Sequence, residues 1–75
     1  MLTRADAVSL LREIIGNCES FCLADVVSIS RNSEAQGWIL KTKWIRPDSE
    51  RDCLNRIILI YGVEVSEIGG YTTFR

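Results

Sequence analysis

Two segments of this chain align without a gap, and each has the features of a short amphipathic helix. They run from Thr3 to Gly16 and from Ser49 to Gly62. Each begins with a hydroxyl residue that is followed three positions later by an aspartate. The hydroxyl can accept a hydrogen bond from a first-turn N–H group, and the carboxylate favours the positive end of the helix. Each segment ends in glycine, which commonly terminates a helix. We therefore expect one helix in each half of the chain.

The apolar residues of both segments recur with helical spacing. In each segment they fall on one face of a helix, and the charged residues fall mainly on the other. The apolar stripes consist of Ala7, Val8, Leu11, Ile14, Ile15 and Cys18 in the first segment and of Cys53, Leu54, Ile57, Ile58 and Tyr61 in the second.

The second segment also has an alternative interpretation as a strand. Residues 57–65 are rich in β-branched side chains, and apolar residues occupy every second position, as in a strand. A strand would, however, put Ile58 and Ile60 on the opposite face and leave the helix-start signal unused. Pro47 just before the segment also suits an entry turn. These features favour the helix.

The remainder of the chain predicts two hairpins. We expect strands over residues 22–31 and 38–45, joined by the polar loop 32–37, and a short strand over 63–68. Two glycines at 69–70 suit a tight turn, after which residues 71–75 would return as an edge strand. The predicted fold is a single α+β domain over residues 1–75, in the order α-β-β-α-β-β. Both helices would pack on one face of a four-stranded antiparallel sheet.

The residue types present argue against most catalytic and metal chemistry. The chain has no histidine, which removes Ser-His-Asp and Cys-His catalysis, and it has no glycine-rich phosphate loop. The three cysteines are an odd number without secretory context, so we expect no disulfide framework. Cys53 is expected to be buried as a small apolar residue, while Cys18 and Cys22 lack the spacing of a zinc site. We predict no enzyme activity, no cofactor and no metal.

Charge and hydropathy point to a protein of the cytoplasm. The net charge is −1, whereas nucleic-acid-binding proteins usually carry a basic excess. No apolar run approaches the roughly 18 residues that span a bilayer, and the first residues lack the apolar core of a signal peptide. We therefore expect a cytoplasmic protein without a membrane partner.

One face of the predicted sheet would be left uncovered by the helices. Alternation in 38–45 directs Trp38, Leu40 and Trp44, with Thr42 among them, to the core. The outward-facing positions are Ile39, Lys41, Lys43 and Ile45. The leading hypothesis is a protein-protein interaction or assembly module, with a homodimer or another protein as partner. Its predicted interaction face comprises Ile39, Lys41, Lys43, Ile45, Tyr71 and Phe74.

A local basic patch provides the alternative hypothesis. Arg31, Lys41 and Lys43 would contact RNA or another anion if they shared the uncovered face. Asp25 lies among apolar residues of the first predicted strand. We expect it to be exposed or hydrogen-bonded, since burial without a partner would raise its pKa.

Overall fold

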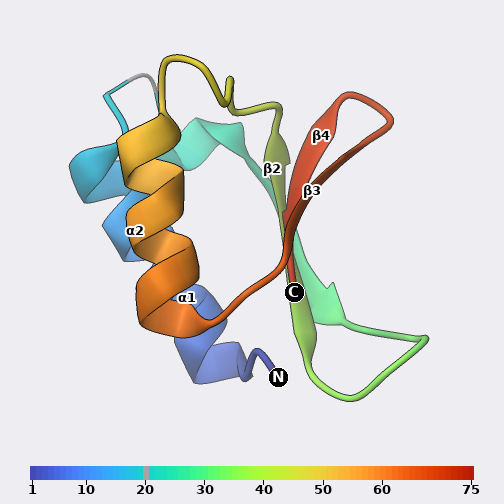
Figure 1. Ribbon diagram of the computed structural model, residues 1–75. Helices are drawn as coiled ribbons and strands as arrows, with labels where there is room; N and C mark the ends of the chain where they lie inside the picture. Colours follow the sequence, from blue (N-terminus) through green and yellow to red (C-terminus); the bar gives the residue numbers. More distant parts are fainter. Residues whose placement is uncertain (20) are drawn as a thin grey trace.

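The structure of the protein is a computed structural model, and it describes residues 1–19 and 21–75. Figure 1 shows the two helices together on one side of a four-stranded sheet. This arrangement confirms the predicted α+β fold and the order of its elements. In chain order the elements are α1 (Arg4–Asn17), the 3-10 turn η1 (Leu23–Asp25), β1 (Val26–Arg31), β2 (Trp38–Lys43), α2 (Arg51–Tyr61), β3 (Val65–Ile68) and β4 (Tyr71–Phe74).

Helix α1 begins as its sequence predicts. Thr3 is the N-cap, and its Oγ1 accepts a hydrogen bond of 3.1 Å from the Asp6 N–H. The helix does not end at Gly16, as expected, but continues to Asn17, with Cys18 as the C-cap. The Cys18 N–H donates to the Ile14 carbonyl, so the last turn closes without a left-handed residue.

Helix α2 confirms the helical interpretation of residues 51–61, but its start differs from the prediction. The N-cap is Glu50, and no side chain caps the first turn. Ser49 instead belongs to a turn in which the Glu50 N–H donates to the Arg46 carbonyl at 3.0 Å. The end of α2 matches the prediction, since Gly62 is the C-cap and has a left-handed φ of 62°.

The sheet has the order β1-β2-β4-β3, with antiparallel pairing throughout. The last strand is therefore an interior strand, and the expectation that it forms an edge is wrong. Gly69 and Gly70 both have positive φ and form the predicted turn between β3 and β4. This order places β1 and β3 at the two edges of the sheet.

The first strand is shorter than predicted. Residues 23–25 form η1, and β1 begins only at Val26. The Cys22 N–H donates to the Asp25 carboxylate at 2.9 Å, and the Asp25 N–H donates to the Cys22 carbonyl. This local hydrogen bonding competes with strand pairing and stabilises a turn there instead.

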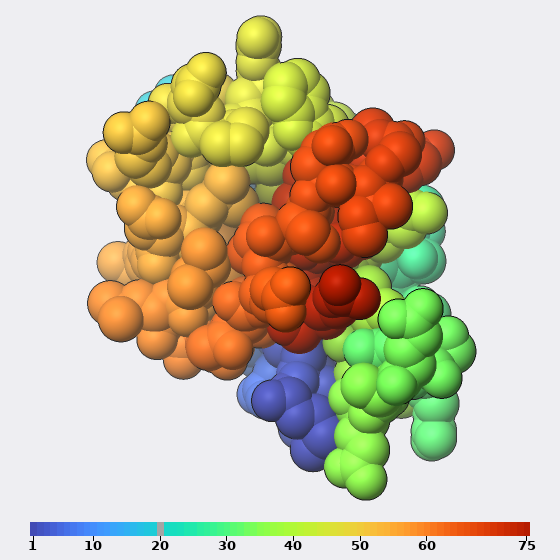
Figure 2. All heavy atoms as spheres, turned by 45° about the vertical axis from the view of Figure 1, so that its right-hand side comes forward, coloured from blue at the N-terminus to red at the C-terminus, as the bar shows by residue number. Residues whose placement is uncertain are grey.

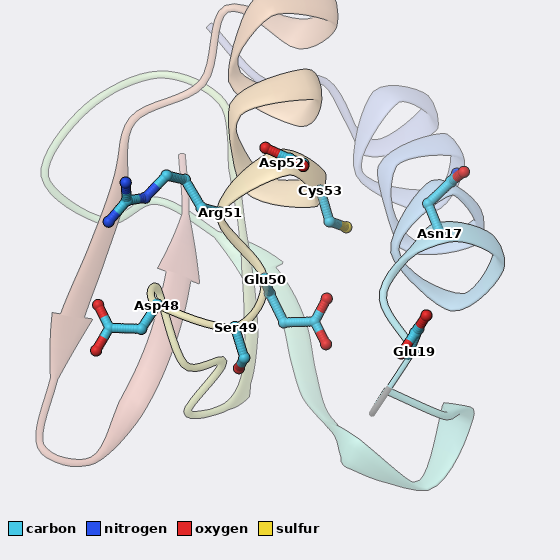
Figure 3. Close-up of a pocket in the computed structure, with 8 residues that line it drawn as sticks. All are labelled: Asn17, Glu19, Asp48, Ser49, Glu50, Arg51, Asp52 and Cys53. Carbon is cyan, nitrogen blue, oxygen red and sulfur yellow. The ribbon is translucent and has the colours of Figure 1, made fainter.

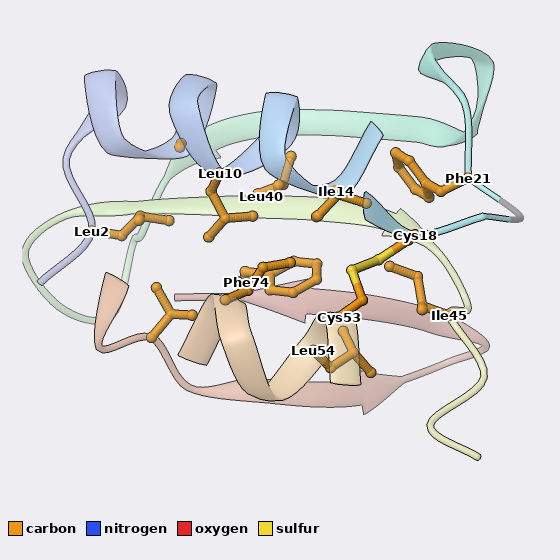
Figure 4. Close-up of a cluster of buried hydrophobic side chains, with 13 residues drawn as sticks. Leu2, Leu10, Ile14, Cys18, Phe21, Leu40, Ile45, Cys53, Leu54 and Phe74 are labelled. Atoms are coloured by element: carbon orange, nitrogen blue, oxygen red, sulfur yellow. A yellow bond between two sulfur atoms is a disulfide. The ribbon is translucent and has the colours of Figure 1, made fainter. Parts of the chain in front are cut away.

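The core lies between the helices and the inner face of the sheet (Figure 4). Leu10 and Ile14 from α1, Leu40 from β2 and Phe74 from β4 are all fully buried. A disulfide between Cys18 and Cys53 joins the end of α1 to the first turn of α2 at one margin of this cluster. The expectation that the chain has no disulfide is therefore wrong, although Cys53 is buried as predicted.

Candidate interaction surface

The sheet has one face that neither helix covers. Leu40 and Phe74 face each other across β2 and β4 and are buried against the helices. Because directly paired residues share a face and side chains alternate along a strand, the neighbouring positions point away from the helices. We call these positions the outer face, which consists of Ser28, Ser30, Ile39, Lys41, Lys43, Ser66, Ile68, Tyr71 and Thr73.

The structure brings four of the predicted interaction residues together on the outer face. These are Ile39, Lys41, Lys43 and Tyr71; Lys43 pairs directly with Tyr71 across β2 and β4. The Lys41 ammonium lies 4.4 Å from the centre of the Tyr71 ring, which is a cation-π distance. The centre of this face is therefore a cationic and aromatic surface.

Two predicted interaction residues, Ile45 and Phe74, belong to the core instead. Phe74 is fully buried opposite Leu40. Ile45 follows the end of β2, is 4% exposed, and donates its N–H to Thr72 Oγ1 at 2.8 Å. The strict alternation assumed for 38–45 stops at Lys43, so Ile45 turns inward. For the same reason Trp44 is 44% exposed rather than part of the core.

The three predicted anion-binding residues do not form one patch. Lys41 and Lys43 lie on the outer face, whereas Arg31 pairs with Trp38 in the register of the opposite face. The Arg31 guanidinium lies 5.6 Å from the centre of the Trp38 ring. Lys43 Nζ is 3.3 Å from the Asp25 carboxylate. The cationic side chains are thus divided between two faces, and one of them already has an anionic partner.

Asp25 is a hydrogen-bonded residue, in agreement with the sequence-based expectation. The hydrogen bond from the Cys22 backbone N–H is the main cause that lowers the pKa of the Asp25 carboxyl below its usual value of 3.8. The Cys22 thiol and the Lys43 ammonium lower this pKa further, and burial opposes them. Asp25 is therefore a carboxylate at neutral pH and neutralises part of the charge near the outer face.

An apolar groove adjoins the β3 edge of the sheet. It has a volume of about 340 Å³ and is bounded by the loop before α2, by one side of α2 and by β3. Its lining residues are Pro47, Arg51, Leu54, Asn55, Ile58 and Val65. Figure 2 shows α2 and the β3–β4 hairpin adjoining each other on this side of the molecule. The sequence analysis did not identify this groove, because it depends on the placement of α2 over one edge of the sheet.

A second hollow, of about 500 Å³, lies between the end of α1 and the start of α2. Figure 3 shows the acidic side chains of Glu19, Asp48, Glu50 and Asp52 around it. Glu50 is 8% exposed, and a carboxylate oxygen of it lies within 4.8 Å of the sulfur atoms of both Cys18 and Cys53. Two thiolates and a carboxylate would suit a divalent metal, but the sulfur atoms are bonded to each other here. In this state the cysteines cannot act as thiolate ligands.

The pairing of Cys18 with Cys53 is the main feature of this region that sequence reasoning missed. Both cysteines lie on the predicted apolar stripes of their helices, so both were expected to face the core. Their separation of 35 residues gives no local signal that the helix ends meet. The meeting of these two helix ends depends on the tertiary fold.

Comparisons of the chain with protein-family models, with curated proteins and with solved structures found no match. Within the residues that the structure describes, neither helix has the length and apolar character that a membrane span requires.

Proposed function

We propose that this protein is a non-enzymatic interaction or assembly module whose outer face binds another protein. The observation that carries the proposal is the coverage of the sheet, since both helices pack on one face only. The outer face exposes apolar and aromatic groups: Ile68 is 55% exposed and Tyr71 is 40% exposed. Exposed apolar groups mixed with polar ones are typical of protein-binding surfaces.

The polar composition of the outer face supports a reversible contact. Ser66 and Thr73 share a hydrogen bond of 2.7 Å across β3 and β4, and the Lys41 ammonium lies over the ring of Tyr71. These interactions hold the side chains in defined positions before a partner arrives. Preorganised aromatic and cationic groups lose little conformational entropy on binding.

A photo-crosslinking experiment in the source cell tests this function. A photoreactive amino acid at Tyr71 reports on the outer face, and the same amino acid at Leu59, which is 86% exposed on α2, is the control. We expect specific protein adducts from position 71 and not from position 59. Equal adducts from both positions, or none from position 71, would contradict the proposed use of the outer face.

The alternative function, RNA or anion binding, has weaker support. It now depends on Lys41 and Lys43 alone, because Arg31 lies in the register of the other face. Binding through these lysines would weaken as salt concentration rises, because phosphate contacts release counterions. Titration of a labelled RNA at two salt concentrations tests it, and Lys41→Gln should then reduce affinity.

The predicted cytoplasmic location is a separate part of the proposal, and the disulfide weighs against it. Disulfides persist in oxidising compartments and are rare in the cytosol. Trapping of free thiols in intact cells tests this point. A protein labelled at Cys22 alone would place the chain in an oxidising compartment, and one labelled at all three cysteines would place it in a reducing compartment.

A further inference from the structure

Strand β3 has one side that no other strand of this sheet pairs with. It is an edge strand, and Glu64 just before it exchanges both backbone hydrogen bonds with Arg75. Because backbone groups alternate in direction along an antiparallel pair, Ser66 and Ile68 also direct their N–H and C=O groups to β4. Val65 and Glu67 must therefore direct theirs away from the sheet. An edge of this kind can accept another strand.

We propose that two copies of this chain associate by antiparallel pairing of their β3 strands, centred on Ser66. This inference goes beyond the proposed outer-face function, because it uses the edge of the sheet and names a second copy of the chain as the partner. In a two-fold dimer each strand meets its own copy in the antiparallel sense. Val65 of each copy then pairs with Glu67 of the other, and both residues have their backbone groups directed outward. The sheet of one copy continues into the sheet of the other.

Several registers of the two β3 strands would keep each side chain on its own face of the sheet. Repulsion between like charges and the length of β3 favour the register centred on Ser66. Pairing centred on Glu67 would place two carboxylates directly opposite each other, and pairing centred on Glu64 would do the same. Like charges in direct opposition are destabilising. Pairing centred on Val65 would recruit residues 62–64, which precede the strand and include the buried Val63. The register centred on Ser66 avoids both problems.

The same register brings opposite charges together at the groove. Glu67 pairs with Thr72, which lies on the helix side of the sheet, so its side chain emerges on that side. Pairing with Val65 would place it beside the groove that Val65 and Arg51 line in the other copy. Arg51 is exposed, and Figure 3 shows its side chain extending away from α2. The two-fold axis would generate two such Glu67–Arg51 contacts.

Glu67 is able to make this contact while keeping its local role. Its Oε1 accepts a hydrogen bond of 2.8 Å from the Gly70 N–H and so supports the turn. A carboxylate has a second oxygen and further lone pairs that can accept from a guanidinium. The apolar side chains of Leu54 and Ile58 in the groove would lose water contact at the same interface, since Ile58 is 40% exposed in a single copy.

Sedimentation equilibrium with charge-reversal variants tests the dimer. We expect Glu67→Arg and Arg51→Glu each to weaken dimerisation about tenfold, as the loss of a close interfacial charge pair does. The combination of both substitutions should restore the affinity of the unmodified chain to within about threefold. Arg4→Glu is the matched control because it makes the same charge change in the first turn of α1, and it should leave the dimer unchanged.

A second variant tests the pairing itself. Glu67→Pro removes an N–H that points away from the sheet, so the internal ladder between β3 and β4 keeps all its bonds. Circular dichroism should show a folded chain, and sedimentation should show a monomer. A dimer that survives Glu67→Pro, or that responds equally to Arg4→Glu, would overturn the proposal.

The failure of this inference is distinguishable from the failure of the proposed function. A chain that stays monomeric up to about 1 mM overturns the β3 dimer. Crosslinks from Tyr71 to a different protein would nevertheless leave the outer-face function intact. If position 71 gave no crosslinks, and the combination of Glu67→Arg and Arg51→Glu restored the dimer, the outer-face function would be overturned and the β3 pairing would stand.

Discussion

Cys18 and Cys53 are joined by a disulfide, with their Cα atoms 5.7 Å apart, and the bond ties the end of α1 to the first turn of α2. The two helices make direct contact along their length, and Glu13 of α1 lies 3.7 Å from the Arg56 guanidinium of α2. Tyr61 is half-buried at the end of α2. Burial is the main cause that raises the pKa of Tyr61, and the negative charges of Glu13 and Asp6 raise it further. The disulfide is the covalent part of this helix–helix contact.

We expect replacement of both Cys18 and Cys53 by alanine to lower the free energy of unfolding. The bond closes a loop with a sequence separation of 35 residues, and the lost restriction of the unfolded chain is worth about 3–4 kcal/mol. Urea denaturation measures the change. Cys22→Ala is the control, because Cys22 is exposed and unbonded to another cysteine. Equal effects of the two variants would show that the disulfide does not stabilise the fold.

The aligned residues Thr3 and Ser49 should respond differently to alanine. Thr3→Ala removes the hydroxyl that accepts from the Asp6 N–H, and we expect a loss of about 1 kcal/mol in stability. Ser49→Ala should change stability by only about 0.5 kcal/mol or less, because Ser49 precedes the N-cap Glu50 and is exposed. Thermal unfolding of both variants checks the prediction. A larger loss for Ser49→Ala would assign the cap of α2 to Ser49.

The aligned glycines should respond to alanine with opposite signs. Gly16 lies inside α1, so Gly16→Ala should stabilise the protein by about 0.5–1 kcal/mol. Gly62 has a left-handed φ of 62°, and Gly62→Ala should destabilise it by about 1–2 kcal/mol. A Cβ at either position has no neighbour within 4 Å, so crowding does not account for the difference. Chemical denaturation of the two variants gives both signs directly.

Asp25 should make stability depend on pH in the acid range. Its pKa is lower in the folded state than its usual value of 3.8, so the unfolded chain binds more protons in that range. The ionised Asp25 carboxylate therefore stabilises the folded state above about pH 4, and this stabilisation is lost as pH falls through the pKa of Asp25 in the folded state. Asp25→Asn should therefore reduce the loss of stability between about pH 5 and pH 2. Melting temperatures across this range measure the effect.

The Lys43 contact should account for the smaller part of this pH dependence. The main cause of the lowered Asp25 pKa is the backbone hydrogen bond from Cys22, and Lys43 contributes less. Lys43→Met should then keep most of the pH dependence that Asp25→Asn removes. If Lys43→Met abolished it, the ion pair would be the dominant cause instead.

Local sequence signals were sufficient to predict the α-helices and the strands of this fold, although not the 3-10 turn η1. The hydroxyl at Thr3, the glycine at Gly62 and the glycine pair at 69–70 act through contacts or backbone angles within a few residues, and each lies where its chemistry predicts. The helical stripe of residues 51–61 outweighed its β-branched composition, because an amphipathic face packed against a sheet overrides intrinsic propensity.

The parts that the sequence did not predict depend on contacts between distant residues. Whether β4 is an edge or an interior strand is decided by its pairing with β2, and this pairing buries Phe74. Ile45 turns inward because Thr72, far along the chain, accepts its N–H. A local pattern of apolar residues does not encode such distant partners. Ile39, Lys41, Lys43 and Tyr71 therefore lie on the outer face as expected, whereas Ile45 and Phe74 lie in the core.

The interior position of β4 constrains the order of events during protein synthesis. Strands β2 and β3 do not pair with each other, because β4 (Tyr71–Phe74) lies between them and pairs with both. The ribosome makes this segment after every other strand of the sheet, so β3 cannot join the sheet until residues 71–74 have left the exit tunnel. The nascent chain can therefore complete its sheet only after these residues have been translated.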